Sequence, residues 1–235
     1  MTKESFFKLK DIVAAFLLTV GLTLLVQAIL AYIPYFTTLT RADISGYNFA
    51  ILYLLQIVVF ALPLFAIVFI RKGFKWRFFG FETVGVKVAI KYILLGYFMY
   101  WIVMMVITNL MIEFDVQLPG FETQETHMPL MGESQIEWII SALIIILVAP
   151  IFEEIFFRGF IFKTLIERSK TWIAFLISGA IFAGIHLEFG TFMPLFILGL
   201  ILNWIFFKTK SIYPGILFHI INNAIALSLE YYLLS

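Results

Sequence analysis

Seven long apolar runs account for most of this 235-residue chain. They cover residues 12–33, 49–70, 88–112, 136–162, 172–187, 192–207 and 212–234. A helix needs about 20 consecutive apolar residues to cross the hydrocarbon core of a bilayer, which is about 30 Å thick. The runs therefore predict an all-α fold, a polytopic transmembrane helical bundle with about seven spans.

The composition excludes an ordinary soluble protein, because 63% of the residues are hydrophobic and only 13% are charged. Soluble domains hold about 45–50% apolar and about 25% charged residues. The formal net charge of +1 is not the basic excess with which proteins neutralise phosphates, so we expect no nucleic-acid partner. The chain has no cysteine, which excludes disulfides, thiolate metal sites and a cysteine nucleophile.

Lysine and arginine are distributed unevenly between the loops, and this distribution predicts the orientation. With the amino terminus in the cytoplasm, every basic residue except Arg41 lies on the cytoplasmic side, whereas the loop 113–137 carries only acidic charges. Because short loops rich in lysine and arginine stay cytoplasmic, we predict a cytoplasmic amino terminus and a multi-pass protein of the cell membrane, surrounded by the lipid bilayer. No repeat or flexible linker divides the chain, so we predict a single integral-membrane domain, residues 1–235.

Polar residues inside the apolar runs are few, and three of them lie close together in the fourth run. Glu153, Glu154 and Arg158 interrupt a segment rich in phenylalanine. Ionisable groups cost on the order of 2.5–3.5 kcal/mol in hydrocarbon on insertion scales, so they usually face the bundle interior and function there. Glu154 and Arg158 are four residues apart, so we expect a structural ion pair. Glu153 has no partner on its own helix and is the candidate general base or acid.

Two histidines and an asparagine in later runs complete the candidate site. His186 ends a stretch of small residues that permits close helix approach. His219 and Asn223 are four residues apart, so they share one helix face. Imidazole and carboxamide groups donate hydrogen bonds without carrying charge, as is needed to hold a developing oxyanion in a dry site. We expect Glu153, His186 and His219 to lie together inside the bundle.

Structural roles compete with these functional ones. A histidine such as His186 can simply bond a neighbouring helix, and we expect Asn203 to join helices in the same way. His127, in the acidic loop, is expected to be a solvated surface residue. Pro150 has no backbone N–H, so we expect the hydrogen bond to Ile146, one turn earlier, to be missing.

Three other types of membrane protease are excluded by their motifs. The chain has no His-Glu-x-x-His segment, which forms the zinc-binding helix of many metalloproteases. It has no Gly-x-Ser-Gly segment, and no aspartate falls within the seven runs. The remaining combination is a glutamate with histidines.

Three motifs on successive late runs resemble those of the CAAX protease and bacteriocin-processing family, also called CPBP or Abi. They are Glu-Glu-x-x-x-Arg (Glu153, Glu154, Arg158), Phe-x-x-x-His (Phe182, His186) and His-x-x-x-Asn (His219, Asn223). Each motif alone is weak, but the three in this order are specific. The resemblance covers residues 136–229 and implies an intramembrane endopeptidase with its catalytic half in residues 136–235.

The resemblance also implies a role for each matched residue. Glu153 would be the general base and would hold the attacking water together with His186. His219 and Asn223 would stabilise the tetrahedral oxyanion, and the ion pair of Glu154 would support the site. The substrate would be a membrane-anchored peptide or protein, because the family includes enzymes that trim prenylated CAAX proteins and bacterial relatives associated with peptide maturation or bacteriocin immunity.

Two schemes for activating the water remain open. Glu153, His186 and His219 could bind a divalent metal such as zinc, in keeping with the name metalloprotease often given to the family. In the other scheme the same groups bind the water directly. We favour the second scheme, with no cofactor, because asparagine is an unusual zinc ligand and only His219 and Asn223 are four residues apart on one helix.

A function without proteolysis is the alternative. A helical bundle with buried glutamate and histidine could be a proton-coupled transporter whose carboxylates relay protons, or a binding or immunity scaffold.

Overall fold

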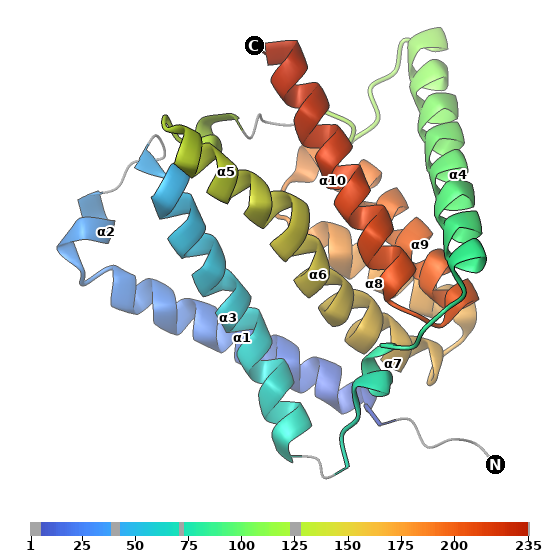
Figure 1. Cartoon of the computed structure of the whole chain (residues 1–235), viewed down its shortest axis with the longest axis horizontal. Helices are drawn as coiled ribbons and strands as arrows, with labels where there is room; N and C mark the ends of the chain where they lie inside the picture. The colour runs from blue at the N-terminus through green and yellow to red at the C-terminus, as the bar shows by residue number, and fades with distance from the viewer. Residues whose placement is uncertain (1–5, 39–42, 71–72, 123–127, 235) are drawn as a thin grey trace. The chain divides into compact units, whose positions relative to one another are not determined.

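The computed structural model describes residues 6–38, 43–70, 73–122 and 128–234, and every regular element in these ranges is helical (Figure 1). Six helical stretches in them are long and apolar enough to cross a membrane. They are α1 (Leu9–Leu30), α3 (Gly46–Ile70), α4 (Val86–Glu113), the stretch Gln135–Ile166, the stretch Phe189–Thr209 and α10 (Tyr213–Leu234). The predicted class is confirmed: the chain is a multi-pass helical membrane protein.

Two of these stretches contain more than one type of helix. Gln135–Ile166 consists of α5 (Gln135–Leu143), the π-helix η4 (Ile144–Val148), α6 (Ala149–Glu153), the π-helix η5 (Glu154–Phe162) and α7 (Lys163–Ile166). Phe189–Thr209 consists of the 3-10 turn η6 (Phe189–Thr191) and α9 (Phe192–Thr209). The shorter elements are α2 (Pro34–Thr38), η2 (Trp76–Phe79), η3 (Met128–Met131) and α8 (Thr171–Gly184).

Helix α8 corresponds to the fifth predicted run but has only 14 residues. A helix of that length is shorter than the about 20 residues that a full crossing needs. The apolar run continues to Leu187, but the helix ends at Gly184, and Leu187 has a φ of +56°, a left-handed conformation that no right-handed helix continues through. Six of the seven predicted runs are thus long enough to span.

Helix α1 begins three residues before the predicted run and includes Asp11, so the prediction that the spanning segments lack aspartate is wrong for this helix. The Asp11 carboxylate accepts a hydrogen bond from the backbone N–H of Lys8 at 2.6 Å. A carboxylate in the first turn stabilises the positive end of the helix dipole. The helix therefore starts at this cap rather than at the first apolar residue.

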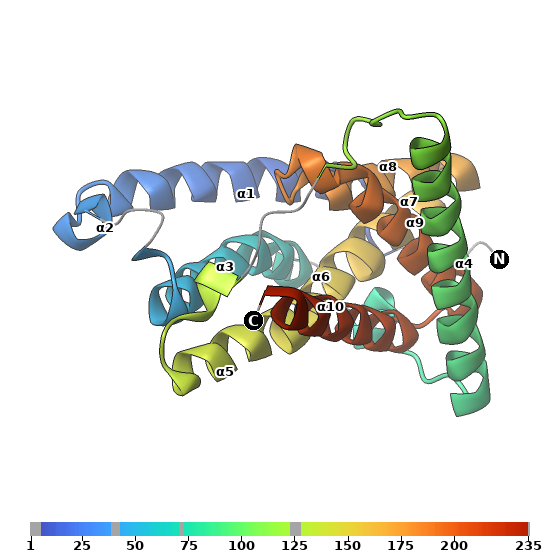
Figure 2. The ribbon, with the colours of Figure 1, turned by 90° about the horizontal axis from the view of Figure 1, so that it is seen from above.

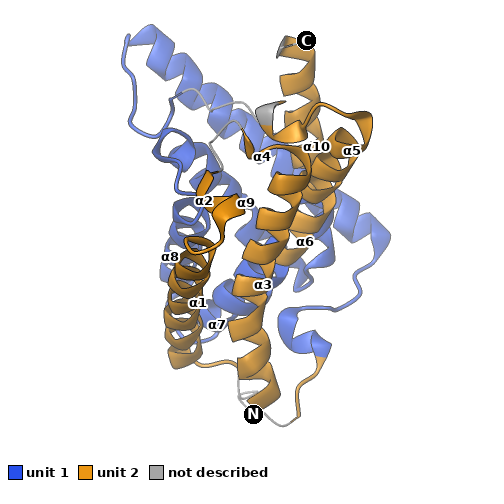
Figure 3. Cartoon of the chain, turned by 90° about the vertical axis from the view of Figure 1, so that its left-hand side faces the viewer, with its two compact units in different colours: residues 1–5, 76–125, 153–219 blue, residues 6–75, 126–152, 220–235 orange. Residues whose placement is uncertain are grey.

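Contacts within the chain define two compact units (Figure 3). Unit 1 contains residues 76–125 and 153–219, and unit 2 contains residues 6–75, 126–152 and 220–235. Glu153 is thus the first residue of a unit 1 segment, and His219 is the last residue of one. The single-domain organisation stays a prediction. Arg41 and His127, for which the sequence predicts exposed positions, lie outside the described residues.

In unit 1, α8 and α9 pack side by side (Figures 1 and 2). Gly199 permits the close approach, because a Cβ there would lie 3.2 Å from the Cα of Gly179. The buried Asn203 also joins the two helices: it accepts a hydrogen bond from Ser178 Oγ at 3.3 Å and donates one to the carbonyl of Phe175 at 3.3 Å. The prediction that Asn203 joins helices is confirmed.

In unit 2, α3 packs against α1 and α5. Helix α5 begins with a capping box, in which Ser134 Oγ accepts from the N–H of Glu137 and the Glu137 carboxylate accepts from the N–H of Ser134. The same carboxylate fills the space beside Gly46, where φ is +50° and a Cβ would collide with it. The first residue of α3 must therefore be glycine.

The π-helix η4 changes the expected effect of Pro150. In η4 the N–H of Ala149 donates to the carbonyl of Ile144, five residues back. One residue further, the same register would pair residue 150 with the carbonyl of Ile145, so proline also leaves that carbonyl without a helical donor, and the predicted loss of a bond to Ile146 stays a prediction.

Candidate functional site

The centre of the candidate site in unit 1 is a buried ion pair on η5. Arg158 Nη1 donates to Glu154 Oε1 at 2.9 Å, and neither side chain is exposed. The predicted pair is therefore present. Arg158 Nη2 donates to the carbonyl of Gly199 on α9 at 3.2 Å, which anchors the guanidinium to a second helix.

The ring of Phe182 lies against this ion pair and against both site histidines. The Arg158 Cζ atom is 4.4 Å from the ring centroid, close enough for a cation–π interaction. The rings of His186 and His219 meet the Phe182 ring edge-on, with centroids 5.0 Å and 5.9 Å away. In the sequence Phe182 stands out only as a motif position, whereas its fully buried ring is the shared contact of three polar side chains.

His219 on α10 is bonded to the ion pair. Its Nδ1 atom lies 3.1 Å from Glu154 Oε1. A carboxylate only accepts hydrogen bonds, so Nδ1 carries the proton and Nε2 holds the lone pair in the neutral ring. Nε2 lies 3.8 Å from Glu153 Oε2, beyond direct hydrogen-bond distance. The structure thus brings Glu153, Glu154, Arg158 and His219 together.

Glu153 is held less tightly than its neighbour. Its side chain is 22% exposed, whereas the side chain of Glu154 is fully buried. Glu153 Oε2 is itself shielded and has no hydrogen-bond partner among the described residues. The two adjacent carboxylates therefore differ: Glu154 has short hydrogen bonds to Arg158 and His219, whereas Oε2 of Glu153 has only the longer contact with His219.

His186 follows the end of α8, and its ring is also fixed by a backbone group. Its Nδ1 atom lies 2.7 Å from the carbonyl of Phe182. Because a carbonyl only accepts, Nδ1 is the donor and Nε2 holds the lone pair in the neutral ring. The His186 ring contacts the Phe182 ring, which in turn contacts Arg158 and the His219 ring.

Asn223 belongs to unit 2, and its amide is engaged there. The Nδ2 atom donates to the carbonyl of Ile145 in η4 at 3.0 Å. The motif resemblance implies that Asn223 binds the oxyanion, and the sequence alone indicates no partner for its amide. The sequence feature that could have indicated a partner for the amide is Pro150, because a proline leaves a carbonyl of the preceding helical turn without a backbone donor.

Tyr97 on α4 is a residue of this region that sequence analysis missed. Its hydroxyl donates to the carbonyl of Phe218 at 2.8 Å, and its ring stacks on the Phe218 ring with centroids 4.2 Å apart. Phe218 directly precedes His219 in the sequence. No local sequence signal links Tyr97 to the third motif, because Tyr97 and Phe218 are 121 residues apart.

The described side chains do not match the predicted three-ligand metal set. Among the described residues, no group of three or more His, Cys, Asp and Glu side chains is arranged to hold a metal ion. Glu153, His186 and His219 thus do not fit a ready-made zinc site.

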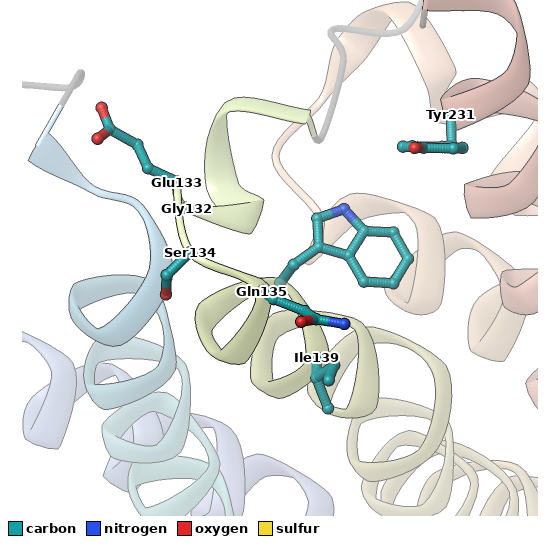
Figure 4. A pocket seen from close by; sticks show the side chains of 7 residues that line it. Gly132, Glu133, Ser134, Gln135, Ile139 and Tyr231 are labelled. Carbon is teal, nitrogen blue, oxygen red and sulfur yellow. The ribbon is translucent and has the colours of Figure 1, made fainter.

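An open pocket of about 490 Å³ lies in unit 2, and none of its lining residues is a predicted site residue (Figure 4). Its walls come from the start of α5 and the end of α10, and in Figure 4 Glu133 and Tyr231 lie on opposite sides of it. It is lined by Gly132, Glu133, Ser134, Gln135, Trp138, Ile139 and Tyr231. The pocket is therefore not the predicted catalytic site.

The segment that contains the candidate site matches a known protein family. Residues 135–225 match the Rce1-like family. Its description reads type II CAAX prenyl endopeptidase Rce1-like. The Rce1-like match includes all three motifs and coincides closely with the range that the motifs indicated. The resemblance drawn from the motifs is confirmed.

Two curated proteins are similar to part of the chain. One is "UPF0177 protein YxdF" of Lactococcus lactis subsp. lactis (strain IL1403), 31% identical over 74 residues, which are 31% of this chain and 40% of that protein. The other is "Putative membrane peptidase YdiL" of Bacillus subtilis (strain 168), 31% identical over 84 residues, which are 36% of this chain and 34% of that protein. The chain thus matches less than half the length of either relative. No solved structure is a significant match.

Proposed function

We propose that the chain is an intramembrane endopeptidase that hydrolyses a peptide bond in a membrane-associated protein or peptide. The Rce1-like match and the name of the Bacillus relative support membrane peptidase activity. The six apolar spans support a substrate that reaches the site from within or beside the bilayer.

The observation that carries the proposal is the pairing state of the two glutamates. Each glutamate has an Oε2 atom without a hydrogen bond, but Glu154 is bonded through Oε1 to Arg158 and His219. The Oε2 atom of Glu153 lies 3.8 Å from His219 Nε2. A purely structural charge cluster has no need of a second, unpaired carboxylate, because an uncompensated charge there only destabilises the fold. A general base does need a free oxygen beside the reacting water.

In the proposed reaction, Glu153 and His186 hold the attacking water. Glu153 takes one proton from the water as the oxygen bonds to the carbonyl carbon of the substrate, and the carbonyl electrons move to its oxygen. The Glu153 proton then passes to the leaving nitrogen as the C–N bond breaks and the carbonyl re-forms. Asn223 donates a hydrogen bond to the oxyanion through its amide. His219 does so through Nε2 after that atom has taken up a proton from solvent, because its Nδ1 already donates to Glu154.

The experiment compares cleavage of a membrane-anchored fluorogenic peptide by wild type, Glu153→Gln and Glu82→Gln in proteoliposomes. Glu82 is an exposed glutamate before α4, so its substitution is the matched control. We expect cleavage by wild type and the control and none by Glu153→Gln, with all three proteins equally folded. Equal cleavage by Glu153→Gln would remove this residue from the mechanism. No cleavage by wild type would overturn the peptidase proposal in favour of transport or binding.

A chelator added to the same assay tests the scheme of water activation. We expect a zinc chelator to leave the rate unchanged, because the described donors do not form a three-ligand group. A rate that falls and returns on adding zinc would favour the scheme in which Glu153, His186 and His219 bind a metal.

A further inference from the structure

The π-helix η4 leaves one backbone carbonyl without a helical donor. Ala149 donates to Ile144 in the five-residue register. In that register the donor for the carbonyl of Ile145 would be residue 150, and Pro150 has no N–H. The carbonyl of Ile145 therefore needs a hydrogen bond from elsewhere, because an unsatisfied backbone group shielded from water is costly.

The side chain of Asn223 supplies that bond. Its Nδ2 atom donates to the Ile145 carbonyl at 3.0 Å, and both residues are half-buried. The contact fixes the orientation of the amide, because an amide turned by 180° would place its oxygen against the carbonyl oxygen. One N–H of the amide is used in this bond, and the second N–H remains for another acceptor.

Pro150 is what reserves the Ile145 carbonyl for Asn223. An ordinary residue at position 150 would supply its own N–H to the same carbonyl in the π register. The amide of Asn223 would then have a competitor and would lose its fixed orientation. The proline thus acts on Asn223 through one carbonyl group, although the two residues are 73 positions apart in the sequence.

We propose that Pro150 is a positioning residue, which orients the Asn223 amide through the carbonyl of Ile145 so that the second N–H can bind the oxyanion. This inference rests on the proposed peptidase function, in which Asn223 is an oxyanion donor. Pro150 touches no reacting atom in this scheme, and its effect passes entirely through Asn223.

A double-mutant cycle on the full-length protein tests the inference. The variants are Pro150→Ala, Asn223→Ala and their combination, and each is measured for thermal unfolding in detergent and for peptide cleavage in proteoliposomes. Pro63→Ala, which replaces another proline inside a helix of unit 2, is the matched control. The cycle isolates the coupling between the two positions.

We expect the variants to affect the unfolding midpoint and kcat in different ways. Asn223→Ala should lower the unfolding midpoint in the wild-type background and much less in the Pro150→Ala background, where the backbone of residue 150 itself provides the N–H. Pro150→Ala should lower kcat by roughly ten- to hundred-fold with KM nearly unchanged, because a misplaced donor weakens binding of the transition state. The double variant should be no slower than Asn223→Ala alone.

Two results would overturn the inference. One is an equal effect of Asn223→Ala on the midpoint in both backgrounds, or the same coupling with Pro63→Ala, because the bond would then not depend on Pro150. The other is an unfolding cycle with the expected coupling but an unchanged kcat in Pro150→Ala, because the bond would then have no catalytic role. If wild type cleaves no peptide, the peptidase proposal fails with its catalytic part, while the unfolding cycle still decides whether Pro150 orients Asn223.

Discussion

Glu154 Oε1 accepts hydrogen bonds from Arg158 and from His219 Nδ1 at 2.9 Å and 3.1 Å, so a single carboxylate oxygen joins η5 to α10. Glu154 therefore not only pairs with Arg158, as the motif implied, but also bonds His219 directly. Because Glu154 Oε1 accepts from Nδ1, it fixes which nitrogen of His219 carries the proton. The lone pair of Nε2 then faces Glu153.

Removing the Glu154 charge should destabilise the protein more than removing the whole pair. Glu154→Leu leaves the buried Arg158 without compensation, and breaking a buried ion pair on one side costs about 3–5 kcal/mol. Glu154→Leu combined with Arg158→Leu removes both charges and should recover a large part of that loss. Denaturant unfolding in mixed micelles measures the free energies of unfolding of the wild type, Glu154→Leu and the double variant. A double variant less stable than Glu154→Leu would show that the pair stabilises the fold in a way other than mutual compensation.

The parts of the site that depend on local spacing could be predicted from the sequence. Glu154 and Arg158 are four residues apart, and this spacing brings side chains together in an α-helix and in the π-helix that is present. Glu153 could be separated from Glu154 for the same reason, since adjacent residues point in different directions on any helix. The six spanning helices followed from the length of the apolar runs alone.

The parts that depend on packing between distant segments could not be predicted. The contact of Phe182 with Arg158 and both histidine rings requires α8, η5 and α10 to meet, and no spacing within one run encodes that. The bond from Asn223 to Ile145 depended on a π register that single-sequence patterns do not reveal. The end of α8 was also missed, because its apolar composition continues past the point where the backbone leaves the helix.

Gly215 should be intolerant of any side chain, because it lies against the other oxygen of Glu154. A Cβ at this position would be 2.8 Å from Glu154 Oε2 and would push the carboxylate away from His219. We expect Gly215→Ala to lower both the unfolding midpoint and kcat. Gly21→Ala is the matched control, since nothing lies within 4 Å of a Cβ there, and it should gain roughly 0.5–1 kcal/mol of helix propensity. Full activity of Gly215→Ala would show that the position of the Glu154 carboxylate does not limit the reaction.

Tyr97 should affect the site from outside the segment that the family match covers. Tyr97→Phe keeps the ring stacked on Phe218 but removes the hydroxyl that bonds the Phe218 carbonyl, so we expect a loss of about 1 kcal/mol in the free energy of unfolding. Because that carbonyl directly precedes His219, kcat should also fall while KM stays nearly constant. Tyr232→Phe, at an exposed position near the carboxyl end of α10, controls for the loss of a tyrosine hydroxyl. If Tyr97→Phe lowers stability and leaves kcat at the level of the control, α4 holds the backbone of α10 without helping to place His219 for the reaction.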